Sequence, residues 1–155
     1  MLEIKDNIKT VREEIEQNPN TGEKNIRLVA VSKGQNYSEI KAAFDAGQSI
    51  FGENYVQEAL EKKELLNSLD IEWHFIGPIQ SNKCKLISEH FSWVQTVDRI
   101  KIANKLNQNR DTKNPLNICI QINISDEASK SGINVSEVFD FAELVHNLKS
   151  LTLRG

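Results

Sequence analysis

The sequence predicts an α/β fold whose strands run parallel. Short apolar segments alternate with longer amphipathic segments along the whole chain of 155 residues, a pattern typical of repeated β/α units. The connections between these segments are short, and strands joined in this way through helices run parallel, with right-handed crossovers. A leading helix is followed by six expected strands and five expected helices in strict alternation.

The chain begins with an amphipathic helix and a buried strand. Apolar residues recur every three or four positions over residues 4–15, so they share one helix face. Pro19 and Gly22 in "NPNTGEKN" end this helix. Four consecutive apolar residues, 28–31, then predict a buried strand that ends at Lys33.

The later elements continue the alternation. Asn36, with Glu39 three residues on, is a capping-box pair that starts the next helix, and Gly47 ends it. Ser81 and Asp98 are expected to cap two later helices. The remaining strands are expected at "SIFG", "EWHFIG", "SWVQTV", "LNICIQINI" and "LTLRG", and the remaining helices at residues 54–69, 81–90, 98–109 and 136–149.

Two architectures fit this alternation: an open doubly wound sheet and a (β/α)8 barrel. The chain stops directly after its sixth strand, with no helix to cover that strand, whereas a barrel needs two more β/α units. We therefore expect a TIM-type barrel that is incomplete in this chain. Residues 1–155 are expected to form a single domain, the N-terminal two-thirds or so of the barrel.

The composition is that of an ordinary globular chain, with 39% hydrophobic and 26% charged residues. A net charge of −3 gives no reason to expect a nucleic-acid partner. No apolar run approaches the roughly 20 residues of a membrane span, and the charged N-terminus does not resemble a signal peptide. Cys84 and Cys119 lack metal or redox spacing, which favours a reducing cytoplasm.

Polar side chains follow the expected strands, at the end where parallel α/β folds place their sites. Lys33 either reaches solvent or pairs with a strand-end carboxylate such as Glu53, or it is a partly buried amine that acts as a Schiff-base nucleophile. Asn54 either caps the following helix or hydrogen-bonds a ligand above the strand.

A second group of candidates follows the third and fifth strands. His74 is either a core histidine with satisfied hydrogen bonds or a polar group beneath a ring-shaped ligand, and alternation places it opposite Trp73 and Phe75. The segment "GPIQSNK" is either a phosphate-binding turn or a tight turn. Lys83 and Lys130 are either solvated or steer an anionic ligand.

Five segments in order make the sequence resemble the YggS-type family of pyridoxal phosphate homeostasis proteins, relatives of the N-terminal barrel of alanine racemase. The resemblance runs from about Arg27 to Gly155. It is carried by "VAVSK", "FGENYVQEALEK", "WHFIGPIQSNK", "VQTVDR" and "QINISDEASKSGI".

This resemblance implies a (β/α)8 barrel that holds pyridoxal 5′-phosphate (PLP) as a Schiff base. Lys33 matches the Schiff-base lysine, and Asn54 matches an asparagine beside the cofactor. His74 and Ile76 match residues that line the floor of the pocket, and Lys130 matches a lysine linked to cofactor handling. No catalytic or metal-binding residue is expected.

The sequence departs from the family in two ways. Gly34, Gln35 and Asn36 stand where the family usually has a larger residue and often a proline soon after. The family also continues beyond the position of Gly155, and those segments carry most of its phosphate cradle. Because a dianionic phosphate needs several aimed donors, we expect these 155 residues to bind PLP weakly or not at all.

The leading functional hypothesis is a PLP carrier for intracellular vitamin B6 homeostasis, without turnover, that could pass the cofactor to apo-enzymes. The alternative is a fold-type III PLP enzyme such as an amino-acid racemase, which needs acid/base groups on both faces of the cofactor. Tyr37 and Tyr55, early in their helices, are expected to be surface or packing residues and do not supply such a group. A barrel without cofactor is a third possibility, and the uncovered last strand could support an oligomer.

Overall fold

The computed structural model describes residues 2–18, 26–125, 127 and 129–155. The predicted helix break at Pro19 and Gly22 lies outside the described residues. No helix among the described residues combines the length and apolar character needed to cross a membrane.

A single parallel sheet carries the strands in the order β1-β2-β3-β4-β5-β6, as the alternation predicted. The six strands are β1 (Ala30–Val31), β2 (Ile50–Glu53), β3 (Glu72–Phe75), β4 (Trp93–Val97), β5 (Leu116–Ile120) and β6 (Leu151–Leu153). Among the described residues β1 and β6 do not pair with each other, so the sheet is an α/β barrel wall that does not close.

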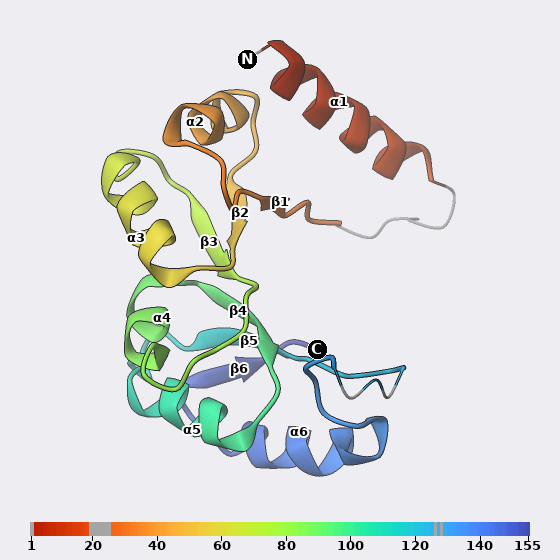
Figure 1. Cartoon of the computed structure of the whole chain (residues 1–155), viewed down its shortest axis with the longest axis vertical. Helices are drawn as coiled ribbons and strands as arrows, with labels where there is room; N and C mark the ends of the chain where they lie inside the picture. The colour runs from red at the N-terminus through yellow and green to blue at the C-terminus, as the bar shows by residue number, and fades with distance from the viewer. Residues whose placement is uncertain (1, 19–25, 126, 128) are drawn as a thin grey trace.

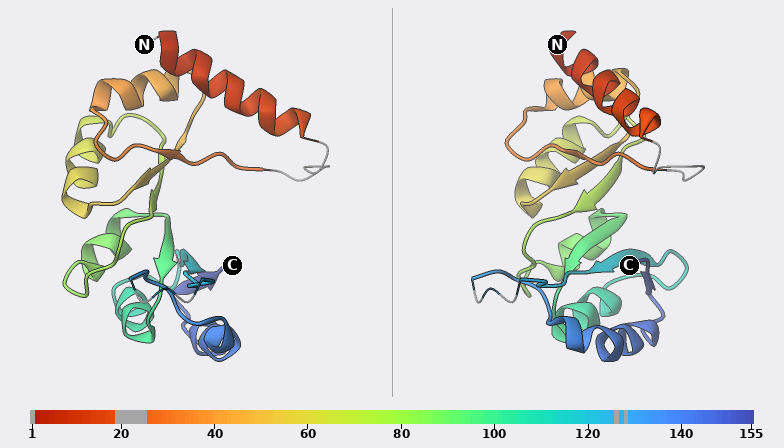
Figure 2. Two further views of the ribbon diagram at one scale, coloured as in Figure 1. Left: turned by 45° about the vertical axis from the view of Figure 1, so that its right-hand side comes forward. Right: turned by 90° about the vertical axis from the view of Figure 1, so that its right-hand side faces the viewer.

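Helices cover one side of this sheet and leave the other side open (Figures 1 and 2). We call the side without helices the inner face. Helix α1 lies across the β1 end of the molecule and contacts α2 (Figure 1). The helices are α1 (Leu2–Gln17), α2 (Tyr37–Asp45), α3 (Val56–Leu65), α4 (Cys84–His90), α5 (Ile100–Gln108) and α6 (Val138–His146), with a 3-10 turn η1 (Val135–Glu137) before α6.

The hydrophobic core lies between the strands and the helices. Alternate strand residues point outward into this layer and meet the apolar stripes that the helical periodicity predicted. The predicted stripe of α5 is fully buried, whereas in α6 only Phe141 and Val145 are buried and Val138, Ala142 and Leu148 are half-buried. Core residues with at most 4% exposure include Phe51, Trp73, Phe75, Phe91, Val94, Ile102, Leu106, Leu116 and Ile118.

One predicted helix start is confirmed and two are wrong. Asn36 caps α2 in a complete capping box with Glu39. Ser81 does not cap α4, because residues 81–83 form a turn and the helix begins only at Cys84. Asp98 does not cap α5, because its carboxylate pairs with Arg99 at 2.9 Å.

The first strand is shorter than its apolar run suggested. Only Ala30 and Val31 pair as a strand, and β2 is the single partner strand of β1 among the described residues. On either side, other bonds continue the attachment to β2. The side-chain amide of Gln48 donates to the Leu28 carbonyl at 2.7 Å, and the amide of Ser32 donates to Gly52 at 3.0 Å.

We expect Ile118→Ala in β5 to lower the free energy of unfolding by about 2–5 kcal/mol, because it empties a fully buried site in the core. Ile124→Ala is the matched control, since Ile124 is 84% exposed and its truncation leaves no cavity. Urea denaturation of both variants measures the difference. Equal midpoints would show that the outer side of β5 does not form the core.

Candidate functional site

The strand ladder brings three predicted site residues to one level. Gly52 pairs with Val31 on one side and with His74 on the other. The ladder continues past the strand ends, because the amide of Ile76 donates to the Glu53 carbonyl at 2.9 Å. Lys33, Asn54 and Ile76 therefore follow one another across the carboxyl ends of β1, β2 and β3, where such folds place their ligands.

Lys33 lies on a tight turn and its side chain is exposed. The turn is closed by the amide of Gln35, which donates to the Ser32 carbonyl at 3.0 Å, and Gly34 adopts a positive φ of 72°. Within the described part of the chain, no hydrogen bond or ion pair engages the Lys33 amine. Glu53, the expected partner of Lys33, instead accepts from Ser32 and Lys62, each at 2.7 Å.

Asn54 does not cap the helix that follows it. Helix α3 has Tyr55 at its N-cap position, with no side-chain cap bond. The side-chain oxygen Oδ1 of Asn54 is buried and accepts no hydrogen bond in the described structure. Gly77 lies against the Asn54 backbone so closely that a Cβ there would overlap it. Asn54 is thus held in place while its acceptor stays unused, and a buried acceptor without a partner is costly.

The "GPIQSNK" turn contributes to a small cavity next to Asn54. This cavity, of about 190 Å³, is lined by Asn54 together with Gln80 and Lys83 of the turn. The turn leads directly into α4, whose N-cap residue is Lys83, without a side-chain cap bond. Phosphate binding by this turn stays a prediction, and Gln80 and Lys83 line the cavity beside Asn54.

Ile76 and Lys130 line a larger open groove of about 570 Å³. Asp98 and Asn123 also line it, whereas Lys33 and Asn54 do not. The side chain of Ile76 extends over Gly52, where an added Cβ would come within 2.9 Å of its Cδ1 atom. Ile76 therefore both covers Gly52 and lines the groove.

Lys130 reaches the groove from a loop that is folded back on the end of β5. The Asn123 side-chain amide donates to the carbonyls of Glu127 at 2.8 Å and Lys130 at 3.3 Å. Gly132, with φ of 128°, brings the loop back against Asn123. The Lys130 amine pairs with Glu127 at 2.7 Å, and both side chains are exposed. Lys130 and Lys33 therefore belong to different parts of the same edge.

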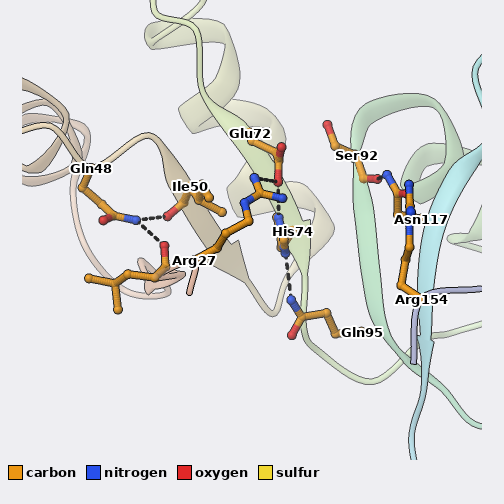
Figure 3. Close-up of polar contacts among 10 residues, drawn as sticks. Arg27, Gln48, Ile50, Glu72, His74, Ser92, Gln95, Asn117 and Arg154 are labelled. Atoms are coloured by element: carbon orange, nitrogen blue, oxygen red, sulfur yellow. Dashed lines mark hydrogen bonds and ion pairs between the residues drawn. The ribbon is translucent and has the colours of Figure 1, made fainter. Parts of the chain in front are cut away.

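His74 occupies the inner face below this edge, opposite Trp73 and Phe75 as the alternation predicted. It is 3% exposed and both ring nitrogens have partners. The Gln95 amide donates to Nδ1 at 2.8 Å, so Nε2 carries the proton and donates to Glu72 at 2.6 Å (Figure 3). Trp93 stacks on the ring at 5.2 Å between centroids. His74 is thus a satisfied histidine in the floor of the site.

The floor continues from His74 to charged groups. Arg27 donates to the same Glu72 oxygen at 2.7 Å (Figure 3). Burial works to raise the pKa of Glu72, but the hydrogen bonds from His74 and Arg27 outweigh it and the pKa is lowered. Burial lowers the pKa of His74, and this outweighs the opposing influence of Glu72. The neutral imidazole is therefore the form that this floor stabilises.

Sequence reasoning overlooked Lys62, which is only 6% exposed. Its amine donates to the Ser32 carbonyl, next to Lys33, at 2.7 Å. The signal was present: Lys62 follows Val56 and Ala59 at spacings of three residues, so it falls on the buried stripe of α3. No group of three or more His, Cys, Asp or Glu side chains in the described residues could hold a metal ion.

We expect the stability of the chain to decrease as the pH falls from about 7.5 to 5.5, because unfolded His74 binds a proton near its ordinary pKa of about 6.5 and the folded chain resists it. Above about pH 7.5 the contribution of neutral His74 to the stability is fully present. His74→Gln should flatten this part of the curve, measured as the urea midpoint against pH. His146→Gln, which changes an exposed histidine, should leave the slope unaltered. Parallel curves for all three proteins would contradict the assignment.

Known proteins share this fold. Residues 2–155 match the family described as "Alanine racemase, N-terminal domain". Proteins named "Pyridoxal phosphate homeostasis protein" from Haemophilus influenzae and Pasteurella multocida are each 49% identical over 160 residues. These alignments cover 99% of this chain and 68% and 69% of the two relatives.

Solved structures agree with the sequence relatives. PipY of Synechococcus elongatus PCC7942 without PLP has a TM-score of 0.86 at 31% identity, and PipY with PLP bound has 0.83 at 30%. Both comparisons cover 98% of this chain and 68% of PipY. Alanine racemase from E. faecalis shares the fold, with a TM-score of 0.70 at 16% identity. The chain therefore belongs to the alanine racemase N-terminal domain family and, within it, to the pyridoxal phosphate homeostasis proteins.

Proposed function

We propose that this protein binds PLP at the carboxyl ends of β1 to β3, holds it as a Schiff base on Lys33, and serves intracellular vitamin B6 homeostasis in the cytoplasm. Its relatives at 49% identity are named for this role, and PipY has been solved with PLP bound. The observation that carries the proposal is the position of Lys33. Its amine has no partner among the described residues and lies at the carboxyl ends of the strands.

The residues present fit an aldehyde cofactor. Lys33 offers an amine without a partner among the described residues, as a carbonyl ligand requires. Asn54 offers an unused buried acceptor in the next strand over, which suits a hydroxyl or protonated ring group of a ligand. Ile76, at the end of β3, supplies an apolar surface that also lines the groove. When bound, PLP supplies an electrophilic aldehyde and an electron-withdrawing ring.

A carrier fits these residues better than a racemase does. Racemisation needs a proton donor and a proton acceptor on opposite faces of the bound amino acid. Tyr37 and Tyr55 are 52% and 64% exposed at the starts of α2 and α3, and His74 has both nitrogens engaged in the floor. We therefore propose binding and release of PLP, with delivery to apo-enzymes, in place of turnover.

On titration with PLP the chain should develop imine absorbance that saturates only in excess of stoichiometric cofactor. We expect affinity to rest largely on the reversible C=N bond. Borohydride reduction and peptide mapping should place the main adduct on Lys33, and Lys33→Ala should abolish it. Lys41→Ala, which removes an exposed lysine on α2, is the control. An adduct spread evenly over the exposed lysines would refute the proposed site.

Asn54→Ala should weaken PLP binding by about three- to tenfold, the usual effect of losing one hydrogen bond. Asn147→Ala provides the control, because Asn147 is exposed and only donates to the Glu143 carbonyl. The half-saturating PLP concentration of the absorbance band measures both. Unchanged binding in Asn54→Ala would mean that its free oxygen faces away from the cofactor.

A further inference from the structure

A buried charge cluster lies directly beneath the turn that carries Lys33. We call Ser32, Glu53, Glu58 and Lys62 the Lys62 cluster. The Lys62 ammonium donates to the Ser32 carbonyl at 2.7 Å, to Glu53 at 2.7 Å and to Glu58 at 2.6 Å. An ammonium has three protons to donate, so all of them are used. Glu53 is 0% exposed and Ser32 is 3% exposed.

The cluster holds both peptide groups that flank Lys33. The Ser32 carbonyl belongs to the peptide group before Lys33 and accepts from Lys62. The Gly34 amide belongs to the peptide group after Lys33 and donates to Glu58 at 2.7 Å. The Ser32 hydroxyl is tied to Glu53 at 2.7 Å as well. The backbone on either side of Lys33 is therefore anchored, while the Lys33 side chain is left free.

Stability alone does not explain this arrangement. Replacing a buried ion pair with apolar side chains is often neutral or stabilising, because removing charges from water is costly. Here one ammonium and two carboxylates hold a single turn, and the glycine of that turn, Gly34, has open space around its Cβ position. Such a turn is free to adopt many conformations unless it is held. A lysine that reacts with an aldehyde needs a backbone in a fixed position, because small displacements of a reacting group lower the reaction rate.

We propose that Lys62, with Glu53 and Glu58, positions Lys33 for imine formation, an inference that rests on the proposed function. The Lys33 nitrogen forms a bond to the aldehyde carbon, and the aldehyde oxygen leaves as water with the two protons of the neutral amine. The step is balanced and needs no other reactant. Lys62, Glu53 and Glu58 act through the backbone of the turn, so they are positioning residues.

Glu58 gives the sharpest test, because its side chain is 32% exposed and its truncation leaves Lys62 paired with Glu53. Glu58→Ala removes the acceptor of the Gly34 amide, whereas Glu58→Gln retains an acceptor oxygen. Lys41→Met is the matched control, since it breaks an exposed pair with Asp45 at the same i,i+4 spacing. Lys62→Met removes the centre of the Lys62 cluster. The labelling of Lys33 in this variant is measured at a temperature where the variant is fully folded.

Two readouts are followed in the whole chain: the rate at which the borohydride-trapped PLP adduct on Lys33 accumulates, and hydrogen exchange of the Lys33 and Gly34 amides. We expect Glu58→Ala to slow Lys33 labelling on the order of tenfold and to accelerate exchange of the Gly34 amide. Glu58→Gln should recover most of the rate. Lys41→Met should stay within about twofold of the unmodified chain, the range of a surface substitution.

The possible failures can be told apart. If the unmodified chain forms no adduct on Lys33, the proposed function fails and the cofactor role of the cluster fails with it. Lys33 could instead be labelled in the unmodified chain and be labelled just as fast in Glu58→Ala and Lys62→Met. In that case the positioning role alone is overturned. A lower melting temperature with an unchanged labelling rate would likewise assign the cluster to stability only.

Discussion

Parallel pairing of strands in chain order is the constraint on which this structure depends. Each strand sends alternate side chains to opposite sides, and the helices cover only one of those sides. The same pairing sets neighbouring strand ends at one level, as the bond from the Ile76 amide to Glu53 shows. A core and a row of chemically useful residues therefore arise from one hydrogen-bonding pattern, without any local motif that encodes both.

The two sides of the sheet differ in what they bury. The outer side is mainly apolar, and its buried charges in the described residues are Glu53 and Lys62, beneath the first turn. The inner face carries a chain of hydrogen-bonded polar side chains from Arg27 through Glu72 to His74 (Figure 3). Most of these polar groups are fixed by their partners, although Glu53 Oε2 and Asn54 Oδ1 accept no hydrogen bond in the described structure. Lys33 alone among the predicted site residues carries an exposed charge with no partner there.

Much of this could be predicted from local sequence. Periodicity and spacing predicted the six strands, the helix stripes, the capping box at Asn36 and the orientation of His74. These signals depend on residues that are near neighbours in the sequence. The two predicted caps were wrong for different reasons. Ser81 lies in a turn that precedes α4, and the Asp98 carboxylate pairs with the adjacent Arg99.

The candidate site was only partly predictable. Strand-end position was enough to select Lys33 and Asn54. Their environments depend on contacts across the fold, such as the bond from Lys62 to Ser32, thirty positions earlier in the chain. A lysine on an apolar stripe is a visible anomaly in the sequence, yet its three acceptors come from different elements and can be known only once the chain is folded.

The contact between Gly77 and the Asn54 backbone has a consequence for how this edge can vary. Main chain rests on main chain there, with no side chain in between to yield. Any residue with a β carbon at position 77 must displace the end of β2, and with it the level at which Asn54 stands beside Lys33. The ends of the second and third strands are therefore coupled as one rigid unit, and a change of ligand at this edge is more readily reached by exchanging side chains such as Ile76 than by reshaping the loops around Gly77.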